Sequence, residues 1–294
     1  MTFHIAEVFW FFTGTCLATI AAVAVRLGLQ IYRQQQAILQ IQRLGGCVRT
    51  RVASPGWLRR WVGDHRPTFL EKVCLVTLES RRVADADLAH LKGLTNLEHL
   101  NLNHTQVTDA GLAQLRGLTH LRFLGLAGTS ATDKGISHLR GLTNLVHLNL
   151  SQTQISDDGV AYLQALANLQ FIDLDGTHVT DAGLERLTGW AALKGIWLDD
   201  TQVTDAGLAC LRVLTRLEGL GLGRTQVSDT GLAYLMELPN LHCVSLDGTH
   251  ATDAGLKHLV KLSGLEDLLL RKTAVTDGGV AKLKRALPDL RIAQ

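Results

Sequence analysis

Several aspartates in the second half of the chain could do chemistry together. They are Asp173, Asp175, Asp199, Asp200 and Asp247. Carboxylate oxygens are preferred ligands of hard divalent cations, so a metal site and a metal-dependent activity are one interpretation. The spacing matches no known cation-binding loop, however. An acidic rim that attracts a basic partner is the favoured alternative, and a merely solvated acidic face is the third.

Large aromatic residues occur in the same stretch. Phe123, Phe171 and Trp197 alternate with apolar residues and are therefore expected to face solvent, beside glycines that leave room for a partner. Exposed aromatics are typical anchors of binding sites, although they could instead cover one another. The sequence thus predicts a partner-binding site made of Phe123, Phe171, Asp173, Asp175, Trp197, Asp199 and Asp247.

Other reactive-looking residues do not form a catalytic pattern. The glycines of residues 219–223 resemble a phosphate-binding loop, but they fall on strand positions and the next helix is expected only near Asp229. His99 and His147 should lie about 10 Å apart, too far to share a metal or a proton. No nucleophile, base and acid come together. We therefore expect no catalytic residues, no metal ligands and no cofactor.

A repeat of 24 residues positions all of these side chains. Its threonines are Thr105, Thr129, Thr153, Thr177, Thr201, Thr225, Thr249 and Thr273, each followed four residues later by an aspartate and six residues later by a glycine. Such a fixed period, with leucines at set offsets, is the signature of a stacked solenoid. The predicted fold class is α/β, built from strand-turn-helix units, with a parallel sheet on the concave side.

One unit, residues 94–117, shows how the pattern predicts structure. Residues 98–102 alternate as a strand does, and Thr105 ends the strand with a hydroxyl that can bond unpaired backbone groups. Thr108 has the chemistry of a helix N-cap, and Asp109 follows in the first turn, where the helix dipole favours a negative charge. Gly111 is expected where helix and strand layers approach closely.

These units read LxxLxxLxLxxTxVTDAGL over about residues 70–292, and in this they resemble the leucine-rich-repeat proteins. The likeness is to the subgroup akin to the ribonuclease-inhibitor-like and F-box-associated repeats. It implies a right-handed horseshoe whose concave face binds a protein or peptide. Threonine stands where related subgroups often carry Asn or Cys, and no F-box is present, so neither their partners nor an adaptor role in ubiquitin ligation carries over.

The first 26 residues contain an uncharged run. Residues 8–25 are long enough to cross a hydrocarbon core of about 30 Å as a helix, and Trp10 lies near one end. A cleavable signal peptide is the competitor, but no Lys or Arg precedes the run. Arg26 and Arg33 follow it, which predicts a single-pass membrane protein with cytoplasmic repeats. In this respect the leader looks like the front end of bacterial membrane-anchored members.

Residues 27–69 are predicted to link this anchor to the repeats. We expect a helix over 27–44 that stops at Gly45 and Gly46, a strand over Cys47–Val52, and an apolar stripe over 57–62 that caps the first repeat or lies on a membrane. The predicted division is 1–26 transmembrane anchor, 27–69 juxtamembrane helix and N-terminal cap, and 70–294 repeat domain. A degenerate copy, 70–93, opens that domain, and a fragment, 287–292, closes it.

Composition narrows the function. Residues 1–69 hold eight arginines against Glu7 and Asp64, while the whole chain has a net charge of only +2, so the repeats are acidic and a nucleic-acid partner is not expected. Five scattered cysteines indicate no disulfide framework, although a bridge from Cys47 to Cys74 stays open. We expect a non-catalytic, membrane-tethered scaffold for a protein or peptide, basic chemistry being favoured, with no small-molecule substrate. A structural envelope protein is the main alternative.

Overall fold

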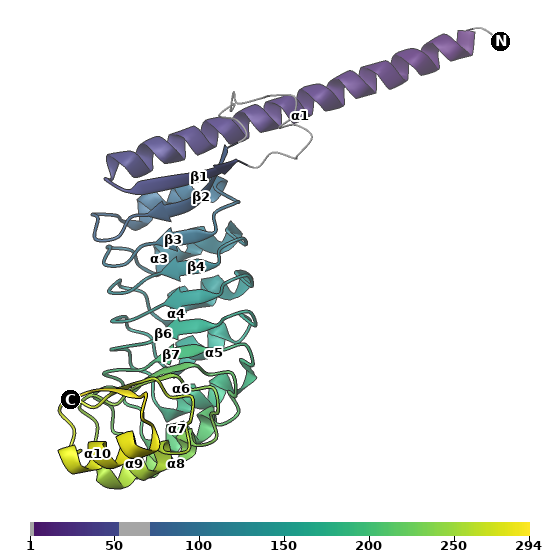
Figure 1. Cartoon of the computed structure of the whole chain (residues 1–294). Coiled ribbons are helices and arrows are strands. Elements are labelled where there is room, and N and C mark those ends of the chain that lie inside the picture. The colour runs from purple at the N-terminus through teal and green to yellow at the C-terminus, as the bar shows by residue number, and fades with distance from the viewer. Residues whose placement is uncertain (1–2, 53–70) are drawn as a thin grey trace.

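The computed structural model describes residues 3–52 and 71–294, without the side chains of residues 3–18 and of positions 20, 24, 27, 52 and 188. The described chain forms a curved solenoid under one long helix (Figure 1). In the described part, eleven strands form one sheet in sequence order, with β1 antiparallel to β2 and all later neighbours parallel. The predicted α/β repeat solenoid is confirmed.

The strands are short because only three residues of a typical repeat pair on both sides. Their bounds are β1 Cys47–Val52, β2 Glu71–Thr77, β3 His99–Asn101, β4 Phe123–Gly125, β5 His147–Asn149, β6 Phe171–Asp173, β7 Gly195–Trp197, β8 Gly219–Gly221, β9 Cys243–Ser245, β10 Asp267–Leu269 and β11 Arg291–Ala293. From β3 to β11 each residue pairs with the residue 24 positions later. The 24-residue phase is therefore the register of the sheet.

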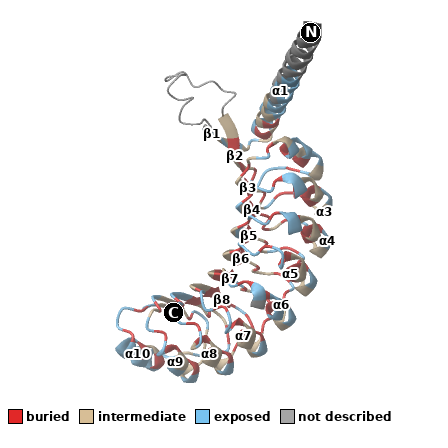
Figure 2. Cartoon of the chain, turned by 90° about the vertical axis from the view of Figure 1, so that its right-hand side faces the viewer, coloured by how far each residue is buried: buried red, intermediate tan, exposed pale blue. Residues whose placement is uncertain are grey.

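Helical turns return the chain to the next strand. They are α1 Phe3–Arg43, η2 Asp85–Gly93, α3 Asp109–Leu112, η3 Ala113–Gly117, α4 Asp133–Ile136, η4 Ser137–Gly141, α5 Asp157–Leu163, α6 Asp181–Glu185, η5 Arg186–Gly189, α7 Asp205–Leu211, α8 Asp229–Leu235, α9 Asp253–Leu259 and α10 Asp277–Ala286, where η denotes a 3₁₀ helix. Helices need more lateral room than strands about 4.8 Å apart. The stack therefore bends with its strands on the concave side (Figure 2).

The core lies between the strands and the helical turns. In the first full repeat Leu100, Leu102, Val107, Leu112 and Leu115 are completely buried, as their periodicity predicts. The threonines from Thr105 to Thr249 at the strand ends are buried as well, and their hydroxyls bond backbone groups as predicted: the Thr105 Oγ1 hydroxyl donates to the Leu102 carbonyl at 2.6 Å. The turn thus satisfies its own polar groups, and a continuous apolar core passes from repeat to repeat.

Each helix start is completed by an aspartate of the preceding repeat. Thr108 is the predicted N-cap and accepts from Ala110 N. The carboxylate of Asp109 begins α3 and also reaches forward: Oδ1 accepts from Thr132 N at 2.9 Å, and Oδ2 accepts from Thr132 Oγ1 at 2.7 Å. We call this series the N-cap ladder. Its pairs are Asp85 with Thr108, Asp109 with Thr132, Asp133 with Ser156, Asp157 with Thr180, Asp181 with Thr204, Asp205 with Ser228, Asp229 with Thr252, and Asp253 with Thr276.

The repeated glycine makes space for that carboxylate. A Cβ at Gly135 would lie 2.2 Å from Asp109 Oδ1, and a Cβ at Gly111 would lie 2.4 Å from Asp85 Oδ1. These separations are far below van der Waals contact. The sequence predicts a close approach of helix and strand layers at this glycine; the close approach is instead to the aspartate of the previous repeat.

The end of α1 caps the first repeat. Ala37 and Ile41 are buried against the core, and Gln34 Nε2 donates to the Glu71 carbonyl at 2.7 Å. The helix ends at Arg43, Gly45 has a positive φ of 76°, and β1 follows as predicted. The expected apolar stripe at 57–62 lies outside the described residues.

The structure corrects the prediction of a membrane anchor. α1 runs without a break through the expected boundary at residue 26, and among the residues that the structure describes no helix is long and apolar enough to cross a membrane. A span needs about 20 predominantly apolar residues. In the part of α1 whose side chains are described, Arg26, Arg33 and Gln34 interrupt any such run. The predicted single-pass localisation with cytoplasmic repeats is therefore wrong.

The other end of the stack closes as the sequence predicts. β11 pairs with β10, joining Asp267 to Arg291 and Leu268 to Ile292 in register. The degenerate first copy also behaves as a repeat, since Val73, Leu78, Val83 and Leu88 are buried. Of the cysteines in the described part, Cys47, Cys74, Cys210 and Cys243 are free thiols.

Candidate functional site

A row of stacked rings crosses the concave face of the sheet. His99 stacks on Phe123 with ring centroids 4.0 Å apart, and His147 stacks on Phe171 with centroids 4.5 Å apart. Phe123 and His147, at 6.3 Å, join the two pairs, and Phe171 continues to Trp197 at 6.3 Å. Parallel strands stand about 4.8 Å apart, so rings in one register column meet face to face. We call these five rings the aromatic row.

Trp197 lies in the neighbouring column and rests on glycines. A Cβ at Gly195 would lie 2.7 Å from Trp197 Cη2 and 2.8 Å from Phe171 Cδ1, and a Cβ at Gly221 would lie 2.9 Å from Trp197 Cδ1. The sequence suggests that these glycines leave room for a partner. The structure gives that room to the Trp197 ring itself, which remains 38% exposed.

An open groove of about 350 Å³ follows the row. It is lined by Phe123, His147, Leu148, Asn149, Phe171, Asp173 and Trp197. Four of the residues predicted from the sequence therefore meet in one groove: Phe123, Phe171, Asp173 and Trp197. Asp175 and Asp199 lie beside it on the following turns, whereas Asp247 belongs to a repeat two further along.

The aspartates next to the groove bind backbone groups of the following repeat. Asp175 Oδ1 accepts from Asp199 N at 2.7 Å, and Asp199 Oδ1 accepts from Gly223 N at 2.7 Å. Asp247 makes the same bond to Arg271 N at 2.7 Å, and Asn103 makes it to Ala127 N at 2.9 Å. We call this series the concave ladder. Its carboxylates are thus held by hydrogen bonds at the ends of the strands and are not freely solvated.

Crowding changes the acidity of these groups. Burial, then the charges of Asp173 and Asp199, raise the pKa of Asp175 to about 7. Burial is also the main reason that the pKa values of Asp173 and Asp199 are raised. Asp200 differs, because its hydrogen bond from Arg224 lowers its pKa. Like charges held close together in a half-buried site disfavour ionisation, so this cluster would gain from a nearby cation.

The histidines of the row are held in the uncharged form. Burial lowers the pKa of His99 and of His147, and the charge of Arg122 adds to the effect at His147. Neutral imidazole rings stack on phenyl rings without carrying a charge into the groove. Phe123 lies between the two histidines, which agrees with the expectation that they do not share a ligand.

Comparison with known proteins places this architecture. A family model described as "Leucine Rich repeat" matches residues 93–115 and 141–163. A solved internalin of Listeria monocytogenes is 28% identical, with a TM-score of 0.55, over 71% of this chain and 82% of the internalin. The chain thus carries leucine-rich repeats and shares the fold of that internalin.

Two further solved structures match this leucine-rich-repeat protein more distantly. Another internalin of the same species is 18% identical over 81% of this chain and 93% of that one, with a TM-score of 0.32. A leucine-rich-repeat protein of Leptospira interrogans is 17% identical over 70% and 62% of the two chains, with a TM-score of 0.43. No curated protein gives a significant match.

The leucine-rich-repeat sheet does not assemble the alternative sites. Within the part of the chain that the structure describes, no group of three or more His, Cys, Asp and Glu side chains could hold a metal ion. Asp175 and Asp199 each direct an oxygen to a backbone amide instead. The glycines of residues 219–223 lie on β8 and the turn after it, and α8 begins only at Asp229, so they form no loop at a helix start.

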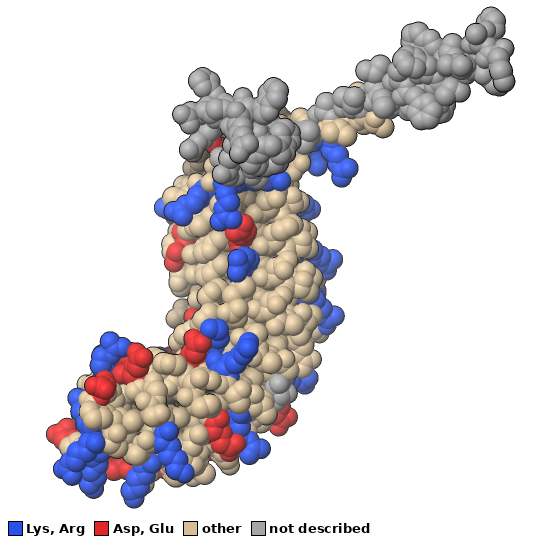
Figure 3. All heavy atoms as spheres, turned by 45° about the vertical axis from the view of Figure 1, so that its right-hand side comes forward, with Lys and Arg blue, Asp and Glu red and all other residues tan. Residues whose placement is uncertain are grey.

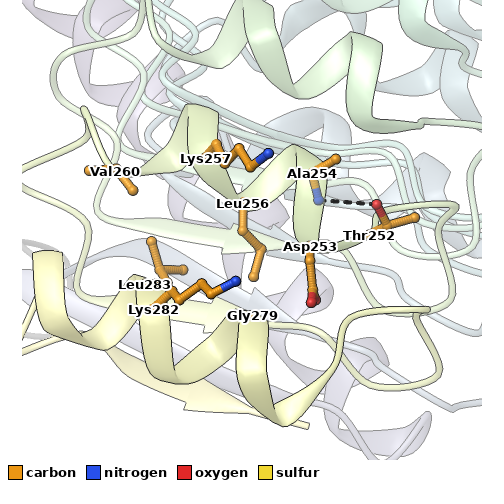
Figure 4. Close-up of a pocket in the computed structure, with 9 residues that line it drawn as sticks. All are labelled: Thr252, Asp253, Ala254, Leu256, Lys257, Val260, Gly279, Lys282 and Leu283. Carbon is orange, nitrogen blue, oxygen red and sulfur yellow. Dashed lines mark hydrogen bonds between the residues drawn. The ribbon is translucent and has the colours of Figure 1, made fainter.

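A second hollow, of about 430 Å³, lies between α9 and α10 on the helical side (Figure 4). Leu256 and Leu283 lie at its base, with Lys257 and Lys282 beside them. The Asp253 carboxylate within it is bound to Thr276. None of the residues predicted for binding lines this hollow, and it has no counterpart of the aromatic row.

Sequence reasoning missed three lining residues of the concave groove. His147 and Asn149 stand in the same register columns as Phe171 and Asp173, and Leu148 lies between them. The signal was present, because the 24-residue phase already aligned these columns. The residue type of His147 suggests a metal ligand or a proton carrier, whereas its ring is part of a stack.

Proposed function

We propose that this leucine-rich-repeat protein is a non-catalytic scaffold that binds a protein or peptide along its concave face. The observation that carries the proposal is the aromatic row beside an open groove. Trp197 covers glycines and yet keeps 38% of its surface exposed at the centre of the sheet. Partly exposed aromatic residues next to a groove are typical anchors of protein interfaces.

The partner should be basic. Asp173, Asp175 and Asp199 stand beside the groove, and burial, together with the charges of neighbouring carboxylates, raises the pKa of each. A cationic group placed there would stabilise their ionised forms, and an acidic rim would also speed association with a basic partner. The binding site we propose comprises Phe123, Phe171, Asp173, Asp175, Trp197 and Asp199, with Asp247 extending the acidic rim along the concave ladder.

A nucleic-acid partner is not part of this proposal. On the face drawn in Figure 3, basic and acidic side chains form small separate groups rather than one basic field. Nucleic-acid-binding surfaces are usually continuous basic patches. The alternative of a structural envelope protein drew on a membrane anchor and loses that support. We propose residues 70–294 as the binding unit, with residues 27–69 as its N-terminal cap.

A displayed random-peptide library tests the proposal. The full chain would be panned, and selected peptides would be measured against the wild type, Trp197→Ala and Val213→Ala. Val213 is the matched control, because it is 55% exposed and follows α7 on the helical side. We expect selected peptides to lose about tenfold or more in affinity with Trp197→Ala, as for an interface anchor, and little with Val213→Ala. A library without binders, or binders indifferent to Trp197, would refute concave-face binding.

A further inference from the structure

We propose that the groove beside Trp197 recognises an arginine side chain, whose guanidinium stacks on the Trp197 ring and pairs with the Asp173 carboxylate. This inference rests on the proposed function and names the chemistry of the partner. Asp173 and Trp197 are register partners on β6 and β7, and both line the groove. One ring face and one carboxylate therefore stand side by side on the same surface.

The aromatic floor suits a planar cation. Trp197 rests on Gly195 and Gly221, so the surface that it exposes is turned away from the sheet and towards a ligand. Phe171 lies 6.3 Å away, with the two rings inclined by only 28°. A guanidinium is flat, weakly hydrated and attracted to the face of a tryptophan ring. The groove of about 350 Å³ has room for one such side chain.

Among the residues that the structure describes, no Lys or Arg side chain forms an ion pair with Asp173. Asp173 Oδ1 accepts a 3.1 Å hydrogen bond from Asp175 N, and the Asp173 carboxylate also has a side-chain hydrogen bond with Asn149. Burial and the charge of Asp199 raise the pKa of Asp173, so its ionised form is under-stabilised. A ligand cation at this position would supply the missing positive charge.

The cations of the same face are engaged nearby. Arg224 is paired with Asp200, and its charge also lowers the pKa of Asp199, while Lys194 Nζ binds Glu218 Oε1 at 2.8 Å. Arg122 precedes Phe123 and lowers the pKa of His147, so it is the positive charge that a ligand must tolerate at the other end of the groove. The site nearest Asp173 and Trp197 is therefore the one that attracts a cation.

Arginine fits this arrangement better than lysine. A guanidinium can stack on a ring and present its N–H edge to a carboxylate at the same time, whereas an ammonium is a compact, strongly hydrated point charge. A lysine would gain the electrostatic attraction and lose most of the stacking. Discrimination between the two at equal peptide charge is therefore the distinguishing property of the site.

Calorimetric titration with two synthetic peptides tests this. Acetylated and amidated octa-arginine and octa-lysine would be titrated into the full chain at one ionic strength. We expect octa-arginine to bind about tenfold tighter, the gain of one partly desolvated stacking contact. With Trp197→Ala the preference should fall to about one, and Trp197→Phe should restore part of it. Thermal melting would show that both variants are folded.

The carboxylate has its own matched control. Asp173→Asn should weaken octa-arginine binding several-fold. Asp158→Asn removes an equal charge from an exposed position on α5 and should change the affinity little. Equal affinity for the two peptides, no binding of octa-arginine, or a preference that survives Trp197→Ala would each overturn the inference. If the peptide library yields concave-face binders that lack arginine, only the arginine assignment fails; if it yields no binders, the proposed function fails too.

Discussion

Two series of aspartates in this protein make the same kind of bond for different reasons. In the N-cap ladder, Asp133 Oδ1 accepts from Ser156 N at 2.8 Å. In the concave ladder, Asp175 Oδ1 accepts from Asp199 N at 2.7 Å. Both carboxylates therefore tie one repeat to the backbone of the next. The N-cap series lies near the helices, and the concave series borders the groove.

The difference lies in what surrounds each carboxylate. The N-cap aspartate also receives a hydroxyl bond, from Ser156 Oγ at 2.6 Å, and sits against a glycine in the next repeat. The concave position tolerates substitution, because Asn103 makes the equivalent bond without a charge. The fold thus requires the charge in one series only. In the other series, burial and the charges of Asp173 and Asp199 raise the pKa of Asp175 to about 7, and this is the series that we propose for binding a partner.

The largest expected effect is at the glycine of the N-cap ladder. Alanine normally stabilises a helix interior relative to glycine by about 1 kcal/mol. At Gly159 its Cβ would lie 2.3 Å from Asp133 Oδ1 and 2.7 Å from Ile155 Cγ2. We therefore expect Gly159→Ala to lower the free energy of unfolding by about 2 to 4 kcal/mol, measured by urea denaturation.

Gly141→Ala is the control for that prediction. Nothing lies within 4 Å of a Cβ at Gly141, which is the last residue of η4 and lies away from the N-cap ladder. We expect this substitution to change stability by less than about 0.5 kcal/mol. Equal losses at the two glycines would mean that the contact with the ladder carboxylate is not what excludes a side chain.

A smaller loss is expected when the carboxylate itself is removed. Asp133→Ala deprives Ser156 of the acceptors of its amide and its hydroxyl. Hydrogen bonds to a charged group contribute about 1.5 to 3 kcal/mol, so chemical denaturation should show a loss in that range. Asp158→Ala, at an exposed position in the first turn of the next helix, α5, should be close to neutral. If Asp133→Ala left the free energy of unfolding unchanged, the hydrogen bonds of the N-cap ladder would not contribute to stability.

The concave ladder should respond in the opposite direction. The folded pKa of Asp175, about 7, exceeds the ordinary value of 3.8 for an aspartate, so the native state binds protons more tightly than the unfolded chain. Stability from this group is therefore present at low pH and is lost as pH rises from about 4 to about 7. Asp175→Asn keeps an acceptor, as Asn103 does, and removes the charge.

We expect Asp175→Asn to be more stable than the wild type by about 1 to 2 kcal/mol at pH 8, with the gain disappearing near pH 4. Thermal unfolding across that pH range measures it, with Asp158→Asn as the charge-matched control. A pH-independent difference, or a loss at pH 8, would show that the carboxylate is not electrostatically strained. The two ladders would then not differ in the way described above.

Much of the fold follows from the 24-residue period. The period fixes the register, so His99, Phe123, His147 and Phe171 fall into one column before any contact is known. The buried threonines and the N-cap residues follow from local chemistry, as at Thr105 and Thr108. These features depend on positions within one repeat, which is why a single copy is enough to predict them.

The candidate site is harder to predict from the sequence than the fold, because it depends on which neighbouring residues each side chain contacts. The alignment of columns did not tell that the Trp197 ring folds onto Gly195, or that Asp109 reaches Thr132 in the next repeat. The first contact joins two residues of the same strand, and the second joins residues 23 positions apart. The apolar run at residues 8–25 led to a wrong prediction of a membrane anchor. A run of apolar residues does not show where the helix that contains it ends, and α1 continues to Arg43.

The N-cap ladder also determines how such a chain can change in length. Every aspartate is served by donors 23 residues ahead and by a glycine 26 residues ahead. Inserting or deleting 24 residues, or a whole multiple of 24, preserves each of these pairs, whereas any other number breaks them at the junction. Duplication of whole units therefore breaks no hydrogen bond of the N-cap ladder. The side chains on the concave face can change from one copy to the next while the ladder stays the same.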